Sequence, residues 1–224
     1  MRRFIRLMLS LTLAFSVSIF HYNSLWALGN GFEEEVFSAF VKMGISEEKA
    51  AELVNKIECG KTLDCFSKEY SNIAPVAEEW NDEGYTATFE YPDGSRAQVS
   101  INSSIIEGTI TGGNYSSGSK WYVWNGAKVM ATWGVVTASY YANFEGSTGF
   151  GYISSVYDRG ISVLAGSYSN VSLSIVQSYA TSTSPAQARL FFEYSSIGNA
   201  VNSTLYLRLF VPYNGSPYAR LSIG

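Results

Sequence analysis

From Tyr85 to the end of the chain, apolar side chains recur at every second position over short runs. The pattern is clearest in Val171–Ile175, Leu190–Tyr194 and Leu205–Val211. A period of two residues puts the apolar set on one face of a β-strand and its neighbours on the other. Gly, Asn and Ser residues separate the runs about every 8 to 12 residues, the spacing of antiparallel sandwiches and barrels and not of βαβ units.

The pattern therefore predicts an all-β domain over residues 85–224, an antiparallel β-sandwich or barrel of about nine to eleven strands. Its best-defined hairpin joins Tyr85–Tyr91 to Arg96–Ile101 through the turn sequence Pro92–Ser95. The remaining predicted strands, besides the three alternating runs, are Ile105–Thr111, Lys120–Asn125, Lys128–Trp133, Val135–Phe144, Gly151–Tyr157 and Ile161–Tyr168.

The preceding region, residues 28–80, has a helical pattern instead. The apolar residues Phe32, Val36, Phe37, Phe40 and Val41 recur at helical spacing, and so do Ala50, Leu53, Val54 and Ile57. Gly44 ends the first segment, Ser46 offers an N-cap to the second, and Gly60 closes it. A small α-helical hairpin is predicted, which must bury its apolar stripe against the β-domain or a partner.

Residues 1–27 have the layout of a secretory signal peptide. Three arginines lie within the first six residues, and an apolar stretch runs from Leu7 to Phe20. We expect cleavage between Ala27 and Leu28, although Leu25 is larger than the residue preferred three places before the cut. The alternative is an uncleaved anchor, but this stretch is shorter than the roughly 20 residues that span a bilayer. The sequence thus predicts a secreted, extracellular protein, free or associated with the cell wall.

Charge and cysteine content exclude several classes. Residues 28–90 hold 14 acidic and 5 basic residues, whereas residues 91–224 hold 5 and 7. This acidic balance without a basic stripe argues against a nucleic-acid partner. Cys59 and Cys65 lack the spacing of a redox pair or a zinc site, and in an exported protein a disulfide between them is the simpler prediction.

The sequence contains few residues or motifs that could support catalysis. The one histidine, His21, falls in the predicted signal peptide, so the exported chain would have none for a nucleophile–histidine pair. Glu107, Glu145 and Asp158 are the acids of the β-region that could converge as a glycosidase pair. No cofactor or metal is predicted, because the chain has no EF-hand loop, P-loop or dinucleotide fingerprint.

Aromatic residues are the most distinctive feature of the β-region. Eleven of them lie between Tyr115 and Tyr157. Alternation must turn some rings outward, where they could stack on sugar rings or sit at a membrane interface, although aromatic pairs also stabilise sheets without any ligand. The candidate binding face is formed by Trp121, Tyr122, Trp124, Tyr140 and Tyr141.

Several segments together resemble a group of secreted Gram-positive bacterial proteins without an assigned activity. They are Gly44–Lys49 through Leu53, Ile57 and Gly60, the turn Pro92–Ser95, Thr132–Val135 with the strand to Phe144, Ile153–Asp158 and Leu205–Val211. The resemblance covers most of the chain after residue 27 and implies export and a β-rich fold. It transfers no catalytic residue, and the cysteine pair departs from the pattern of the group.

Three hypotheses about function follow. The first is a non-enzymatic binding protein whose aromatic face contacts a cell-wall glycan, another surface or a protein partner. The second is a membrane-active toxin or bacteriocin-like factor that inserts amphipathic hairpins. The third is a glycoside hydrolase that uses acids of the β-region.

Overall fold

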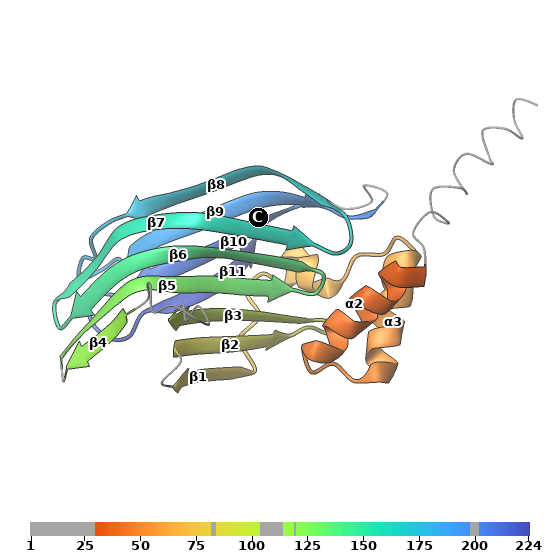
Figure 1. The fold of residues 1–224 in the computed structure, drawn as a ribbon, viewed down its shortest axis with the longest axis horizontal. Helices are drawn as coiled ribbons and strands as arrows, with labels where there is room; N and C mark the ends of the chain where they lie inside the picture. Colours follow the sequence, from red (N-terminus) through yellow and green to blue (C-terminus); the bar gives the residue numbers. More distant parts are fainter. Residues whose placement is uncertain (1–29, 82–83, 104–113, 119, 198–201) are drawn as a thin grey trace, which may run out of the picture.

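A computed structural model describes residues 30–81, 84–103, 114–118, 120–197 and 202–224. Two antiparallel sheets of seven and four strands pack face to face, and two helices lie at one end of them (Figure 1). Of the two predicted architectures, the sandwich is the one formed. The predicted signal peptide, its cleavage site between Ala27 and Leu28, and the strand Ile105–Thr111 lie outside the described residues.

The helical hairpin is formed as predicted, by α2 (Asn30–Lys42) and α3 (Glu47–Glu58). The Ser46 hydroxyl accepts a hydrogen bond from the backbone N–H of Lys49 at 3.4 Å, so it caps α3. Both helices turn apolar residues into the core, where Phe40 and Leu53 are fully buried. Two single-turn 3-10 helices, η1 (Asp64–Phe66) and η2 (Lys68–Tyr70), continue the chain toward the sheets.

The larger sheet, sheet A, has the strand order β1-β2-β3-β5-β6-β7, with β4 also pairing with β5. Its strands are β1 (Ala77–Asn81), β2 (Gly84–Glu90), β3 (Arg96–Ser103), β4 (Asn114–Gly118), β5 (Trp121–Trp133), β6 (Val136–Ser147) and β7 (Phe150–Val163). The smaller sheet, sheet B, has the order β11-β10-β9-β8. Its strands are β8 (Ser167–Gln177), β9 (Ala186–Ser195), β10 (Asn202–Val211) and β11 (Tyr218–Ile223).

The core lies between the two sheets and follows the alternation of the sequence. In β6, β9 and β10 every second residue is buried, so each strand turns one set of side chains inward. Trp133 of sheet A meets Phe192 of sheet B edge to face, with 6.2 Å between ring centroids. The apolar set therefore fixes which face of each strand points inward, because a shift by one residue would expose it.

Strand boundaries differ from the prediction where glycines interrupt the pattern. Lys120–Asn125 and Lys128–Trp133 are one strand, β5, with a bulge between Trp124 and Ala127. Gly126 adopts φ 72° in this bulge, and its N–H donates to the Asn143 side chain at 2.5 Å. Likewise, β7 joins the predicted strand Gly151–Tyr157 to the first part of Ile161–Tyr168, whose last two residues belong to β8 instead.

The β-region also begins earlier than residue 85. Strand β1, which the sequence assigned to the helical region 28–80, pairs with β2 in sheet A. Its run Glu78-Glu79 has no alternating apolar residues, which explains why the pattern missed it. Strand β4 was not predicted either, and it also has no alternating apolar residues. Strand β11 was not predicted although its apolar residues do alternate.

A cluster of charged side chains fastens the helical hairpin to the sandwich. Lys56 of α3 contacts Asp64 at 2.9 Å and Asp93 of the β2–β3 turn at 2.7 Å. Asp64 and Asp93 each accept a hydrogen bond from the other's backbone N–H, and the Ser95 hydroxyl donates to Asp93 at 2.6 Å. The turn sequence Pro92–Ser95 thus positions both the hairpin between β2 and β3 and the helices beside it.

Candidate functional site

Two members of the predicted aromatic face are interior residues. Trp124 and Tyr140 are only 2% and 0% exposed, so their place on a binding face was predicted wrongly. Tyr140 points inward because its neighbours Ala138 and Ala142 share the buried face of β6. Trp124 stacks on Phe144 in the core, with 5.9 Å between ring centroids.

The other three members do not form one surface. Trp121 is 48% exposed on the outer side of sheet A. Tyr122 is half-buried and points to the inner side, where its ring meets Phe144 edge-on at 6.4 Å. Tyr141 faces outward and stacks on Tyr157 of β7 at 5.9 Å. Period-two alternation therefore divides the predicted face between the two sides of the sheet.

Three other rings do meet on the outer surface of sheet A: Phe150, Tyr152 and Tyr179, called the ring cluster below. Tyr152 and Tyr179 stack with 4.5 Å between centroids, and Phe150 lies 6.4 and 6.5 Å from them. Tyr179 is 58% exposed and Phe150 37%. The cluster lies where β6 ends and β7 begins, at the end of the sandwich opposite the helices (Figure 1).

The backbone beneath the ring cluster is tightly held. Tyr152 and Tyr179 form an antiparallel bridge, flanked by hydrogen bonds from Ala180 N–H to the Gly151 carbonyl at 2.7 Å and from Ile153 N–H to the Ser178 carbonyl at 2.9 Å. A Cβ on Gly151 would lie 2.6 Å from the Pro212 carbonyl oxygen, so a larger residue would displace backbone. The rings are therefore presented by a rigid corner of the fold.

Polar groups border the rings on the same face. Glu145 of β6 lies opposite Tyr152, and Ser147 lies opposite both Phe150 and Trp121. Trp121 therefore belongs to this outer face, two strands away from Phe150. The neighbouring Tyr179 phenol, together with partial desolvation and Glu145, raises the pKa of Tyr152. Rings beside hydroxyl and carboxylate groups make a surface suited to a ligand with both apolar and hydroxylated faces.

The predicted acids do not converge among the described residues. Glu145 lies opposite Tyr152, whereas Asp158 follows Tyr157, the partner of Tyr141, so the two acids are about five positions of β6 apart, about 17 Å at the usual rise of a strand. This separation exceeds that of retaining and inverting glycosidase pairs, roughly 5 to 10 Å. Glu107 lies outside the described residues.

The two cysteines are not bonded to each other, so the predicted disulfide is wrong in this structure. Cys59 is exposed at the end of α3, whereas Cys65 is buried in η1. Cys65 lies where the chain meets the β2–β3 turn, and its backbone N–H donates to the Ser95 hydroxyl at 3.2 Å. Five intervening residues would allow a disulfide, but η1 places Cys65 in the interior while Cys59 stays at the surface. Burial also raises the pKa of the Cys65 thiol.

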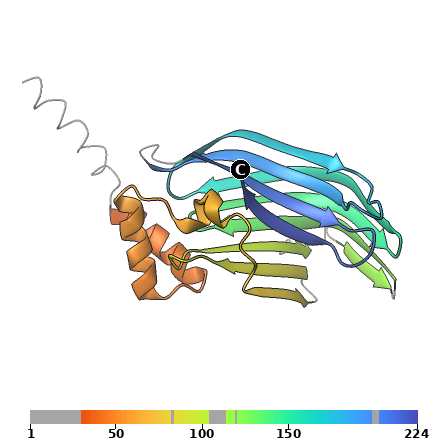
Figure 2. The same ribbon diagram turned by 180° about the vertical axis from the view of Figure 1, so that it is seen from behind.

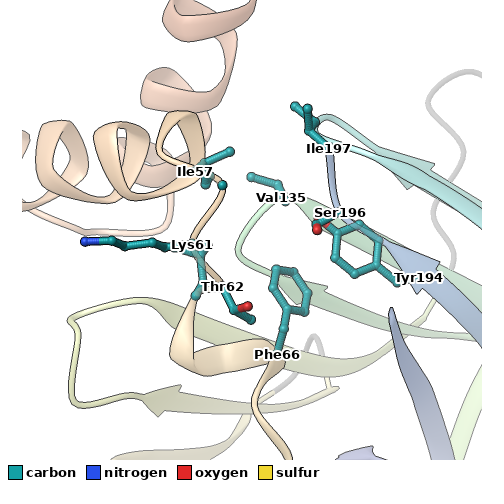
Figure 3. A pocket seen from close by; sticks show the side chains of 10 residues that line it. Ile57, Lys61, Thr62, Phe66, Val135, Tyr194, Ser196 and Ile197 are labelled. Carbon is teal, nitrogen blue, oxygen red and sulfur yellow. The ribbon is translucent and has the colours of Figure 1, made fainter. Parts of the chain in front are cut away.

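A crevice between the helical hairpin and the sandwich is lined by Ile57, Lys61, Thr62, Phe66, Val135, Tyr194, Ser196 and Ile197, among others (Figure 3). Its volume is about 20 Å³, far below the roughly 300 to 1,000 Å³ of ligand sites. Phe66 packs on Tyr194 with 4.7 Å between centroids, and the Tyr194 hydroxyl donates to the Ala165 carbonyl at 2.6 Å. We interpret this crevice as a packing junction.

A second cavity, of about 450 Å³, lies between the edge of sheet B and the inner side of β1 and β2. Arg208, Arg220 and Ser222 line it from sheet B, and Glu78 and Tyr85 line it from sheet A. The connector of residues 71–75 closes one side. This cavity is large enough for a small molecule, and no local pattern in the sequence predicts it.

Two features are absent from the described part of the chain. No group of three or more His, Cys, Asp or Glu residues there could hold a metal ion. Within the same residues, no helix combines the length and the apolar character needed to cross a membrane.

Comparisons with known proteins give one structural likeness. No protein-family model matches the chain, and no curated protein matches it. A crystal structure of a hypothetical protein from Listeria monocytogenes is similar at a TM-score of 0.35 and 21% sequence identity. The match covers 62% of this chain and 92% of the Listeria protein. A likeness of this size supports no conclusion about function.

Proposed function

We propose that the chain is an exported, non-enzymatic binding protein that holds a cell-wall glycan on the ring cluster of Phe150, Tyr152 and Tyr179. The observation that carries this proposal is the grouping of three rings on the outer surface, two of them more than a third exposed. Rings at the surface contribute little to the core, and an exposed apolar group of this kind is typical of an interaction surface.

The geometry favours a sugar over a purely apolar ligand. The C–H faces of a pyranose stack on aromatic rings, while its hydroxyls need polar partners at the rim. The phenols of Tyr152 and Tyr179 and the carboxylate of Glu145 supply such partners beside the rings. A membrane interface would suit the rings alone, but the neighbouring carboxylate would lose hydration there.

Export and wall association rest on the sequence of residues 1–27 and on the resemblance to secreted Gram-positive proteins. A binding role also fits the acids of β6 and β7, because Glu145 and Asp158 are too far apart for the usual glycosidase pair.

Retention on purified cell-wall glycan tests the proposal. The chain from Leu28 onward is mixed with insoluble peptidoglycan, and the bound fraction is compared with that of the double variant Phe150→Ala/Tyr179→Ala. Loss of two stacking rings should weaken retention by about fivefold to a hundredfold, since each aromatic contact contributes roughly 0.5–1.5 kcal/mol. The matched control is Tyr168→Ala, which removes a ring that is 47% exposed on sheet B.

Retention that is unchanged in the double variant would overturn the proposal, and so would equal losses in the double variant and the control. Release of dye from lipid vesicles by the same chain, lost in the double variant, would instead support the membrane-active alternative. Sugar release from the glycan that depends on Glu145 would support the glycosidase alternative.

A further inference from the structure

Three arginines form a row across the outer face of sheet B, called the arginine row below. Arg208 of β10 lies opposite Arg189 of β9 on one side and opposite Arg220 of β11 on the other. Residues directly opposed on antiparallel strands share a face and lie about 5 Å apart, and like charges in this arrangement destabilise a sheet. The row therefore carries an electrostatic cost that other contacts must offset.

Aromatic rings hold the arginines in place. The guanidinium carbon of Arg208 lies 4.4 Å from the centroid of the Tyr206 ring, and that of Arg220 lies 5.1 Å from the Tyr218 ring. Arg189 lies 5.7 Å from Phe191. Such cation–π contacts contribute about 0.5–1 kcal/mol each at exposed sites. A guanidinium stacked on a ring keeps its N–H edges available for an oxyanion.

The row also lacks partners of opposite charge. None of the ion pairs found among the described residues involves Arg189, Arg208 or Arg220. Glu193, the acid of β9, lies four positions from Arg189, and its carboxylate accepts a hydrogen bond from the Asn170 side chain at 2.6 Å. The buried Nε of Arg189 has no hydrogen-bond partner. Burial and the neighbouring Arg189 lower the pKa of Arg208.

One end of the row opens into the cavity of about 450 Å³ at the edge of sheet B. Figure 2 shows this side of the molecule, with β10 and β11 in blue and the connector of residues 71–75 in gold. Arg208 and Arg220 lie on one wall, where Arg208 also donates to the Ser222 hydroxyl. On the other wall the Tyr85 hydroxyl donates to Glu78 at 2.7 Å. The cavity is therefore positive on one wall and negative on the other.

We infer that this cavity binds a small sugar phosphate, with the phosphate on Arg208 and Arg220 and the sugar hydroxyls toward Glu78. Adjacent guanidinium groups recognise a phosphate through paired N–H donors. A carboxylate on the opposite wall accepts hydrogen bonds from hydroxyls but repels a second anionic group, which favours a ligand with one charged end. The volume suits a molecule of this size. The site is separate from the ring cluster and does not depend on the proposed function.

Calorimetric titration with glucose 6-phosphate, inorganic phosphate and glucose tests this inference. The sugar phosphate should bind more tightly than either part alone. Arg220→Gln should weaken its binding about tenfold or more, because a hydrogen bond between charged groups contributes roughly 1.5–3 kcal/mol. Arg220 is exposed on an edge strand, so this variant should fold. The matched control is Arg159→Gln, which removes an exposed charge from sheet A.

Two further variants separate the parts of the site. Glu78→Gln should reduce the preference for glucose 6-phosphate over inorganic phosphate, whereas Phe150→Ala/Tyr179→Ala should leave both titrations unchanged. The inference would be overturned by the absence of binding of either phosphate compound. Equal affinities for the two compounds, or equal losses in Arg220→Gln and Arg159→Gln, would also overturn it.

Discussion

The rings inside the sandwich and the rings on its outer surface differ in position: the interior includes rings of β5 and β6, and the ring cluster comes from β7 and the segment after β8. Trp133, Tyr140 and Phe144 are at most 2% exposed and fill the space between the sheets. Phe150 and Tyr179, at 37% and 58%, lie on the outer surface and pack mainly on each other and on Tyr152. The interior rings pack between the two sheets, and the surface rings are those that the proposed function assigns to ligand binding.

This difference shows why aromatic content alone cannot locate a binding face. Tyr140 and Tyr141 are adjacent in β6, yet the first is buried and the second faces outward onto Tyr157. Availability depends on the strand face, and the bulge at Gly126 changes the alternation within β5. Substitutions of interior residues should therefore lower stability, whereas substitutions of surface residues should leave stability nearly unchanged.

The largest expected effect comes from an interior ring. Trp133→Ala should lower the free energy of unfolding by about 3–5 kcal/mol, because it leaves a cavity where the two sheets meet. Urea denaturation measures this change. The matched control is Trp121→Ala, which removes an exposed tryptophan and should change stability by no more than about 0.5 kcal/mol. Similar losses in both variants would contradict the division between interior and surface.

Loss of the half-buried charge of Asp93 should have an effect on stability between those of the interior and the exposed tryptophan. Burial raises the pKa of Asp93, but the hydrogen bonds from Lys56 and Ser95 outweigh it, so the pKa lies below its usual value. A depressed carboxyl pKa stabilises the fold above the unfolded-state pKa of about 3.9, and this contribution is lost as the pH falls through the folded-state value.

Asp93→Asn should therefore cost about 2 kcal/mol at pH 7 and flatten the loss of stability below about pH 4. Denaturation curves from pH 7 to pH 2 measure both effects. As a control, Asp158→Asn changes an exposed acid on β7 and should leave the curve unaltered. A wild-type stability that does not fall in acid, or an Asp93→Asn curve parallel to it, would contradict the proposed role of this cluster.

The two cysteines allow the stability effects of a buried and an exposed position to be compared. Cys65→Ser should cost about 1–3 kcal/mol, because it places a hydroxyl in the interior, whereas Cys59→Ser should change stability by less than about 0.5 kcal/mol. A reducing agent should leave the unfolding transition of the wild type unchanged, because the cysteines are not bonded. A transition that falls in the reductant would restore the disulfide that the sequence predicts.

The smallest effect on stability is expected at the ring cluster. Phe150→Ala and Tyr179→Ala should each change the free energy of unfolding by about 0.5 kcal/mol, as surface substitutions usually do. Thermal unfolding of both single variants measures this change. A loss comparable to that of Trp133→Ala would make the cluster part of the core and remove the reason to assign it to binding.

Much of the fold could be predicted from the sequence because its signals are local. Period-two alternation located β9 and β10, helical spacing with the Ser46 cap located α2 and α3, and the turn at Pro92–Ser95 located the hairpin of β2 and β3. Strand β1 has no such pattern, and the bulges in β5 and β7 look like strand ends when only neighbours along the chain are considered.

The candidate sites were less predictable because they form between distant segments. Tyr179 pairs with Tyr152 through an isolated β-bridge outside the regular strands. No residue spacing along the chain predicts that these two rings are in contact. The three arginines of the arginine row become neighbours only through the register of β9, β10 and β11. A search for a basic stripe along the sequence therefore misses this row.

The binding role of the ring cluster is tested most directly by nuclear magnetic resonance of the ring protons during titration with soluble peptidoglycan fragments. We predict that the ring protons of Phe150, Tyr152 and Tyr179 shift together in a saturable manner, while those of Tyr168 and Tyr141 stay in place. Saturable shifts confined to other residues, or no shifts at fragment concentrations that saturate retention on the insoluble glycan, would contradict it.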